Sequence, residues 1–279
     1  MPAVEAWAIE PLWVQFEALI PARVDAHPLG CHNPRIPDRV VFDKLVAKLV
    51  FGGSYRKHAD RTCSATTMRD RRDEWIKAGV FARLEQIVLD AYDRIVGLQL
   101  DDVTVDGQIT KAPCGGEAAG KSPIDRGKQG IKWSRLTEAQ GIPLGCVITG
   151  ANRHDSPLLR PTLERLARFG FDLPDTMRIH LDAGYDSNTT RELLDELGFD
   201  GHIQPKGEIL PINHTRRWVV ERTNSWTSRG FNIVTICTER HTAVIDAFLA
   251  LINAIIITRR LIRQAWTTHR WPTRTTRRP

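Results

Sequence analysis

One carboxylate occupies a position suited to holding a metal ion. Asp182 ends the segment Met177–Asp182, in which apolar and polar residues alternate as on the two faces of a strand. Gly184 follows closely and allows a sharp turn. A carboxylate at the end of a strand can bind a metal ion. For Asp182 taken alone, however, capping of the following helix is the simpler interpretation.

Two further acids could converge on Asp182. Asp106 follows the strand-like segment Leu98–Val105, and Gly107 comes directly after it. Glu221 lies in Thr215–Arg229, which is predicted to be a helix. The chain therefore offers two strand-end aspartates and one helical glutamate.

The elements that carry these acids predict an α/β layer. Four strands and two helices are expected in this order: Leu98–Val105, Ile131–Leu136, Ile142–Thr149, helix Ser156–Phe169, Met177–Asp182 and helix Asn188–Leu197. With acids on the first and fourth strands, this order fits a ribonuclease-H-like mixed sheet flanked by helices.

A small all-α domain is predicted before the sheet. Its apolar periodicities indicate the helices Trp7–Ile20, Asp38–Val50, Ser64–Ala78 and Val80–Val96. The third helix offers Arg69, Arg71 and Arg72 on its predicted outer face, which is typical of a helix-turn-helix that binds DNA. An ordinary helical bundle with solvent-facing arginines explains this segment equally well.

The C-terminal part combines an apolar helix with a basic tail. We expect Thr242–Ile262 to be a helix buried against the sheet rather than a membrane span, given its length and interior polar residues. No acidic residue follows Asp246, whereas seven arginines do: Arg259, Arg260, Arg263, Arg270, Arg274, Arg277 and Arg278. With Trp266 and Trp271 among them, the tail suits a nucleic-acid backbone, although a solvated terminus is an equal alternative.

Composition excludes several classes of protein. The 279 residues are enough for one large or two ordinary domains, and the chain is not disordered as a whole. Five separated cysteines without a CxxC pair argue against a disulfide framework or a zinc site. Met1 begins no basic-then-apolar leader, so a soluble cytoplasmic protein is expected.

A glycine-rich segment matches a phosphate-binding pattern without its context. Gly115–Ser122 satisfies GxxxxGK[ST], but Pro113 precedes it and Pro123 follows where a helix should begin. We interpret it as a mobile loop. The basic side chains around it could instead line a phosphodiester backbone: Lys111, Lys121, Arg126, Lys128 and Lys132.

Six sequence blocks resemble the bacterial DDE transposases of the insertion-sequence-five group. They are VDG (Asp106), DRGKQG (125–130), GIPLG (141–145), GANRHDS (150–156), HLDAGYD (180–186) and RRWVVERT (216–223). The resemblance spans the helical N-terminal region and nearly all of the remaining chain, and the blocks follow the family's order. The resemblance implies domains at 1–97 (helical, DNA-binding), 98–263 (ribonuclease-H-like, catalytic) and 264–279 (basic tail).

By this resemblance, Asp106, Asp182 and Glu221 are the catalytic acids and the ligands of two Mg²⁺ or Mn²⁺ ions. The implied activity is cleavage of DNA at the ends of an insertion sequence and strand transfer to target DNA, without ATP. The implied partners are double-stranded DNA, namely terminal inverted repeats and target, and further copies of the chain in a homodimer or larger assembly. No membrane is implied, and the expected location is the cytoplasm, with the nucleoid.

The chain departs from the wider family near Glu221. Related transposases carry Tyr, Arg, Glu and Lys along this helix; Arg217 fits and could contact phosphate, but His214 and Ser228 replace the tyrosine and the lysine. Two alternatives remain open: a catalytically silent DNA-binding protein derived from a transposase, and a P-loop nucleotide hydrolase.

Overall fold

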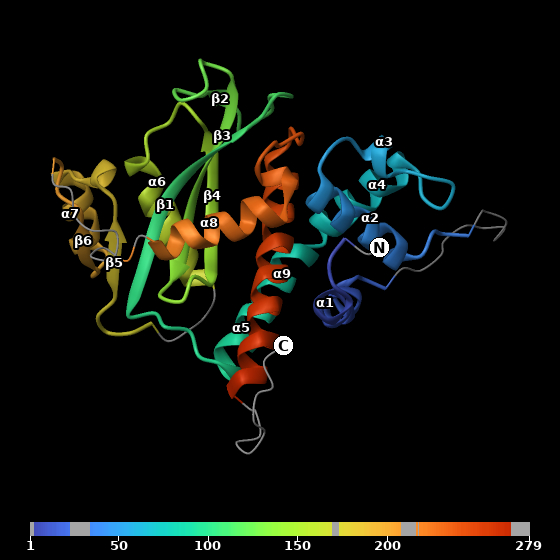
Figure 1. Ribbon diagram of the computed structural model, residues 1–279, viewed down its shortest axis with the longest axis horizontal. Helices are drawn as coiled ribbons and strands as arrows, with labels where there is room; N and C mark the ends of the chain where they lie inside the picture. Colours follow the sequence, from blue (N-terminus) through green and yellow to red (C-terminus); the bar gives the residue numbers. More distant parts are fainter. Residues whose placement is uncertain (1–2, 23–33, 169–172, 208–215, 217, 269–279) are drawn as a thin grey trace, which may run out of the picture.

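The computed structural model describes residues 3–22, 34–168, 173–207, 216 and 218–268. Its centre is a mixed sheet in the order β2-β3-β1-β5-β6, with β4 also paired to β3 (Figure 1). The strands are β1 (Asp102–Lys111), β2 (Gly120–Lys121), β3 (Gln129–Glu138), β4 (Pro143–Gly150), β5 (Arg178–Leu181) and β6 (Asp200–Ile203). Strands β1, β3 and β4 are antiparallel, whereas β1, β5 and β6 run parallel. The predicted α/β class is confirmed.

Helices cover both faces of this sheet. One face packs against α6 (Ser156–Leu163), where the Thr162 hydroxyl donates to Ser134 Oγ of β3 at 2.8 Å. The short helices η1 (Glu164–Arg168) and η2 (Ala183–Tyr185) and helix α7 (Asn188–Glu196) follow in the chain. The other face carries α8 (Trp218–Gly230), η3 (Asn232–Val234) and α9 (Thr242–Thr268). In Figure 1, α8 crosses in front of the strands.

The N-terminal region is helical, as predicted. It contains α1 (Ala6–Leu19), α2 (Asp38–Phe51), α3 (Tyr55–His58), α4 (Ala65–Lys77) and α5 (Val80–Ile95). Its centre is aromatic: the ring of Phe16 lies 4.8 Å from that of Phe42 and 5.0 Å from that of Trp75. These side chains belong to one hydrophobic core that continues into the sheet.

Helix α9 joins the two regions. It stands between the sheet and the N-terminal helices and packs against α1, α4, α5, α8 and β4 (Figure 1). By length and composition it could cross a membrane, but it lies mostly buried inside the protein. It continues to Thr268, six residues beyond the predicted helix end at Ile262 and across the predicted boundary at 263/264. Residues 269–279, the rest of the predicted tail, lie outside the described residues.

Strand β1 is longer than its sequence suggested. Gly107 does not end it, because antiparallel pairing with β3 continues to Lys111. The glycine instead admits a neighbour: a Cβ at Gly107 would lie 2.3 Å from Asp155 Oδ1. Asp106 is therefore inside a strand and not at its end.

The glycine-rich segment is docked and forms no P-loop. Ser122 leads through turns into β3, and no helix begins there. The Glu117 carboxylate accepts a hydrogen bond from Thr242 N at 2.8 Å and contacts His241, so this loop caps the N-terminus of α9. Gly116 lies against the backbone of Arg240. No helix follows Ser122, as a P-loop nucleotide hydrolase requires, so that alternative is wrong, whereas the mobility of the loop stays a prediction.

Candidate active site

Asp106 and Asp182 lie where two parallel strands separate. The last paired residues of β1 and β5 are Thr104 and His180. Asp106, which is still within β1, and Asp182, which directly follows β5, each come two residues after this last pair. The topology thus brings these two predicted acids to one place in the sheet.

Helix α8 brings the third acid to the same strand. It packs across β1 and β3, and Asn224 Nδ2 donates to Asp106 Oδ2 at 3.3 Å. Glu221, exposed to solvent, lies one helical turn before Asn224 and on the same side of α8. Ser228 Oγ donates to the Asn224 carbonyl at 2.8 Å, so it is used within the helix. His214 and Arg217 lie outside the described residues.

The three acids do not form a ligand cluster in the structure. Among the residues that the structure describes, no group of three His, Cys, Asp or Glu side chains is arranged to hold a metal ion. Asp182 accepts a hydrogen bond from Gly184 N at 2.9 Å, which is the capping role that its sequence also allowed. The donor set is nevertheless chemically suited to Mg²⁺, because all three side chains offer carboxylate oxygens.

Two orphaned amide oxygens on this face also suit a cation. Asn224 Oδ1 is buried and has no hydrogen-bond partner in the described structure. Gln108 Oε1, two residues after Asp106 on β1, is likewise buried and unpartnered. Buried polar atoms are rarely left without a hydrogen-bond partner. The donors for these two oxygens are therefore expected to come from outside the chain.

Three carboxylates affect the pKa of a buried tyrosine. Tyr185 is 1% exposed and follows Asp182 in η2. Burial raises the pKa of its hydroxyl well above the usual value, and the carboxylates of Asp155, Asp106 and Asp182 raise it further. All three aspartates therefore lie within electrostatic reach of one phenol.

A buried arginine lies opposite Asp106. Arg135 of β3 is the register partner of Asp106 and is 1% exposed. Burial lowers the pKa of this guanidinium, while Cys146, Glu85 and Asp106 act in the opposite direction.

A hydrogen bond between His180 of β5 and Asp102 of β1 links the same two strands. His180 Nε2 lies 2.7 Å from Asp102 Oδ1, and Arg216 Nη1 lies 2.8 Å from Asp102 Oδ2. Burial lowers the pKa of His180, which favours the neutral ring. This geometry is that of a histidine packed and hydrogen-bonded inside the fold. The contribution of Asp102 was not predicted, although it shares a strand face with Asp106.

The outward orientation predicted for Arg71 and Arg72 is wrong. They are 5% and 6% exposed, respectively. Arg71 pairs with Asp38, and Arg72 pairs with Glu239 at 3.3 Å. Both guanidinium groups are therefore committed to partners inside the protein.

Lys132 is also unavailable to a phosphate backbone, because it is 7% exposed and its Nζ lies 3.0 Å from Asp155 Oδ2. Three predicted DNA-binding residues, by contrast, are exposed: Arg69, Arg126 and Lys128.

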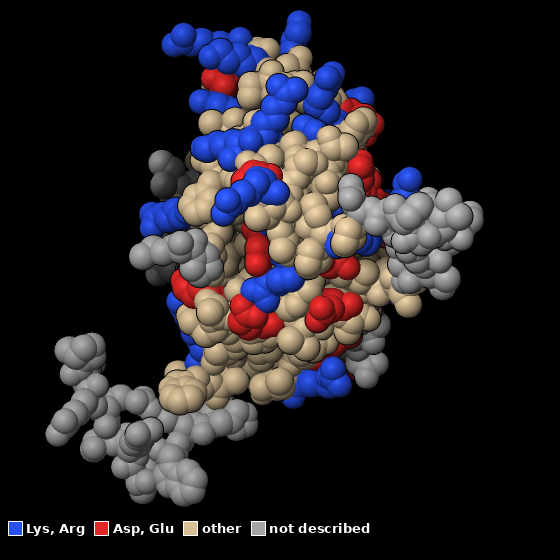
Figure 2. Space-filling model, turned by 90° about the vertical axis from the view of Figure 1, so that its right-hand side faces the viewer, with Lys and Arg blue, Asp and Glu red and all other residues tan. Residues whose placement is uncertain are grey.

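Exposed basic side chains gather at one end of the molecule. Figure 2, a view onto the N-terminal helices, shows Lys and Arg mainly at the top and Asp and Glu mainly below. That end holds α3, α4 and the β2–β3 arm in Figure 1. The exposed basic residues of these segments are Arg56, Lys57, Arg61, Arg69, Lys77, Lys121, Arg126 and Lys128. Arg56, Lys57 and Arg61 were missed because they lie in and beside α3, which has no apolar periodicity.

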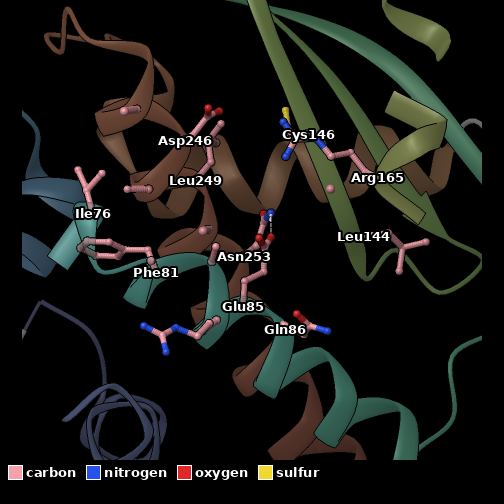
Figure 3. A pocket seen from close by; sticks show the side chains of 17 residues that line it. Ile76, Phe81, Glu85, Gln86, Leu144, Cys146, Arg165, Asp246, Leu249 and Asn253 are labelled. Atoms are coloured by element: carbon pink, nitrogen blue, oxygen red, sulfur yellow. Dashed lines mark hydrogen bonds between the residues drawn. The ribbon is translucent and has the colours of Figure 1, made fainter. Parts of the chain in front are cut away.

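A cavity lies away from the predicted acids. It has a volume of about 420 Å³ and lies between α5, α9 and β4 (Figure 3). Asn253 Nδ2 donates to Glu85 Oε1 at 2.6 Å in its wall, and burial raises the pKa of Glu85 and of Asp246. None of the three predicted catalytic acids lines it.

Comparison with known proteins relates more than half of the chain to one family. Residues 98–257 match the family model described as "Transposase DDE domain". A curated relative from Burkholderia cepacia, "Putative transposase for insertion sequence element IS402", is 33% identical over 137 residues. That match covers 47% of this chain and 64% of the relative, so the chain matches somewhat less than two thirds of that protein.

Solved structures are only distantly similar. The Mos1 mariner paired end complex with Mn is 10% identical, with 96% of this chain and 89% of that chain covered and a TM-score of 0.30. A piggyBac transposase synaptic complex with hairpin DNA is 12% identical, with 98% and 74% covered and a TM-score of 0.39. At these TM-scores the likeness supports no argument about this chain.

Proposed function

Because this chain belongs to the transposase DDE domain family, we propose that it is a transposase of the insertion-sequence-five group that cleaves DNA at the ends of its element and joins them to target DNA. One observation carries the proposal. Asp106 and Asp182 each come two residues after the last pair of the adjacent parallel strands β1 and β5. Helix α8 carries Glu221 one turn before Asn224, which is bonded to Asp106.

In this proposal, Asp106, Asp182 and Glu221 hold the catalytic Mg²⁺ or Mn²⁺ ions. When bound, two such ions activate the attacking oxygen and stabilise the leaving oxygen of a phosphodiester. The chain would contribute oxygen ligands and the fixed spacing of β1 and β5.

The reaction needs no covalent protein intermediate. Water attacks the phosphodiester at the element's end and releases a 3′-hydroxyl. That hydroxyl then attacks a phosphodiester of the target DNA, with an oxygen of the broken strand as the leaving group. Each step replaces one P–O bond by another.

The exposed basic end of the molecule is proposed to bind DNA. Phosphate contacts supply much of the affinity of such proteins, and exposed arginines and lysines provide them. Arg69 and its neighbours on α3 and α4 would bind one segment of duplex, with Arg126 and Lys128 on the β2–β3 arm. Arg217 is proposed to contact phosphate close to Glu221.

The finer features of the architecture are also part of the proposal. When the two-residue strand β2 is left out, the strand order is β4-β3-β1-β5-β6. In this order β3 runs antiparallel to its neighbours β1 and β4, which supports a ribonuclease-H-like core. The 1–97 region would act as a helix-turn-helix-like DNA-binding domain, and 98–263 as the catalytic domain. Pairing of two element ends calls for a homodimer or larger assembly, working on the nucleoid in the cytoplasm.

One observation favours a second candidate, a catalytically silent DNA-binding protein. The acids among the described residues are not gathered into a metal-binding group. Such a protein would keep the basic surface and lose cleavage.

A cleavage assay separates the two. Duplex DNA carrying the element's ends is incubated with the full chain and Mg²⁺ or EDTA, comparing wild type, Asp182→Asn and the surface control Asp195→Asn. The proposal predicts Mg²⁺-dependent nicking at the ends by wild type and Asp195→Asn, and none by Asp182→Asn. Binding of the ends without cleavage by any of the three would overturn the catalytic assignment in favour of the silent protein.

A further inference from the structure

We infer that Asn224 is a positioning residue of the acid site, and that its amide group both orients Asp106 and accepts a hydrogen bond from the hydration shell of a bound divalent cation. The inference rests on the proposed function, because it assigns a role beside the same acids. It adds a neutral side chain to a site otherwise described by carboxylates.

The first argument is the position of Asn224. It lies on α8 one turn after Glu221, and so on the same side of that helix. Its Nδ2 donates to Asp106 Oδ2 at 3.3 Å. One side chain therefore links the helix that bears Glu221 to the strand that bears Asp106, and it fixes the orientation of that carboxylate.

The second argument is the unused half of the amide. Asn224 Oδ1 is buried and has no hydrogen-bond partner in the described structure, although a carboxamide oxygen can accept two hydrogen bonds. An apolar residue of similar size would avoid this cost. The oxygen is therefore explained by a donor that arrives with a ligand.

The third argument is charge. The surroundings of Asn224 already contain the carboxylates of Asp106 and Glu221. A further carboxylate at position 224 would repel them when no cation is present, whereas an amide oxygen adds a dipole without a charge. Water molecules held by Mg²⁺ are strong donors, and Mg²⁺ keeps several of them in proteins. An amide oxygen next to the ligands is a suitable acceptor for such a water.

A neighbouring residue fits the same account. Gln108 Oε1 is also buried and unpartnered, and it shares a face of β1 with Asp106. The amide oxygens of Gln108 on β1 and of Asn224 on α8 thus both lack a hydrogen-bond donor from the chain. Water molecules around a bound cation would supply such donors.

The test measures binding of Mn²⁺ alone to the full chain, by loss of the free-Mn²⁺ signal in electron paramagnetic resonance, together with the melting temperature in the absence of metal. The variants are Asn224→Leu, Asn224→Asp and Asp106→Asn. Asn188→Leu is the matched control, because Asn188 is an exposed asparagine near the start of another helix.

We expect Asn224→Leu to weaken Mn²⁺ binding by about 10-fold or more, as removal of outer-shell partners does. Its metal-free melting temperature should equal or exceed that of wild type, because an orphaned oxygen is removed. Asn224→Asp should melt lower without metal and gain more from Mn²⁺ than wild type does. A purely structural asparagine would not give this metal-dependent rescue. Asn188→Leu should change neither binding nor rescue.

Three outcomes overturn the inference. Asn224→Leu that binds Mn²⁺ as tightly as wild type, while Asp106→Asn does not, refutes the role of Asn224 and leaves the proposed function intact. If Asn224→Leu fails to fold, absence of extra Mn²⁺ rescue in Asn224→Asp refutes it. Equal Mn²⁺ binding by wild type and Asp106→Asn removes the metal chemistry of the proposed function and this inference with it.

Discussion

Replacing Glu239 should destabilise the protein strongly, because this carboxylate neutralises two buried cations. Its Oε1 lies 2.8 Å from Lys48 Nζ, and its Oε2 lies 3.3 Å from Arg72 Nη1. Lys48 is 1% exposed and Glu239 is 7% exposed, so solvent screens the pair weakly. The cluster ties α2 and α4 to the segment that leads into α9.

The expected magnitude follows from what remains after Glu239→Gln. Lys48 keeps only neutral acceptors, among them the carbonyl of Gly53 at 2.8 Å, whereas Arg72 keeps the half-exposed carboxylate of Asp73 at 2.7 Å. One cation thus loses its only carboxylate partner and the other loses one of two. Removing one partner of a buried pair typically costs about 3–5 kcal/mol of unfolding free energy, and we expect a loss in that range.

Urea unfolding, followed by far-ultraviolet circular dichroism, measures the loss. The double variant Lys48→Met/Glu239→Gln should recover part of the stability, because the uncompensated charge is gone. Glu10→Gln is the control: Glu10 pairs with Arg39 at 2.6 Å but is exposed, so little change is expected. A loss below about 1 kcal/mol for Glu239→Gln, or strictly additive single and double variants, would refute the reasoning.

Three further predictions concern pH, thiol reactivity and backbone fit. Burial lowers the pKa of His180, so its neutral ring stabilises the fold above the unfolded pKa of about 6.5 and this contribution is lost as the pH falls. The melting temperature of His180→Gln should therefore fall less than that of wild type between about pH 7 and pH 5, and equal falls would contradict this. Burial raises the pKa of Cys146 to about 11, so iodoacetamide should label exposed Cys114 in the native protein and leave Cys146 unlabelled, as peptide mass spectrometry can check. Gly116→Ala should cost about 1–3 kcal/mol more than Gly127→Ala in urea unfolding. The reason is that a Cβ at Gly116 meets backbone at 2.5 Å and one at Gly127 meets nothing within 4 Å; equal losses would show that the loop is not docked.

Periodicity predicted the elements well where local pattern decides them. The helix predicted at Asp38–Val50 is α2, Asp38–Phe51, and the helix predicted at Val80–Val96 is α5, Val80–Ile95. Each has a regular apolar stripe and a glycine near its end. The two-residue strand β2 and the exposed strand β6 were missed, because their pairing is fixed by distant partners rather than by their own residues.

The orientation of charged side chains could not be read from local sequence. Arg71 and Arg72 look like surface residues on a polar helix, but their partners Asp38 and Glu239 lie 33 and 167 residues away. A single helix does not reveal such pairings. The prediction that a strand ends at Gly107 was wrong for a related reason. Gly107 is small because the Asp155 side chain packs against it, and not because the chain turns there.

The acid site was partly visible in the sequence. Strand period and helix period placed Asp106, Asp182 and Glu221 on elements that the structure brings side by side. The role of Asn224 was hidden, because an asparagine on a polar helix face gives no signal until its neighbour across the fold is known.

The place of α9 has a consequence for synthesis on the ribosome. The helix is made last, yet both the N-terminal helices and the sheet pack against it. Neither region can complete its apolar interior until the last residues of α9 leave the exit tunnel, so the nascent chain stays sensitive to proteases and to aggregation for most of its translation. A message broken before Thr242 would thus yield degraded fragments instead of a stable amino-terminal piece.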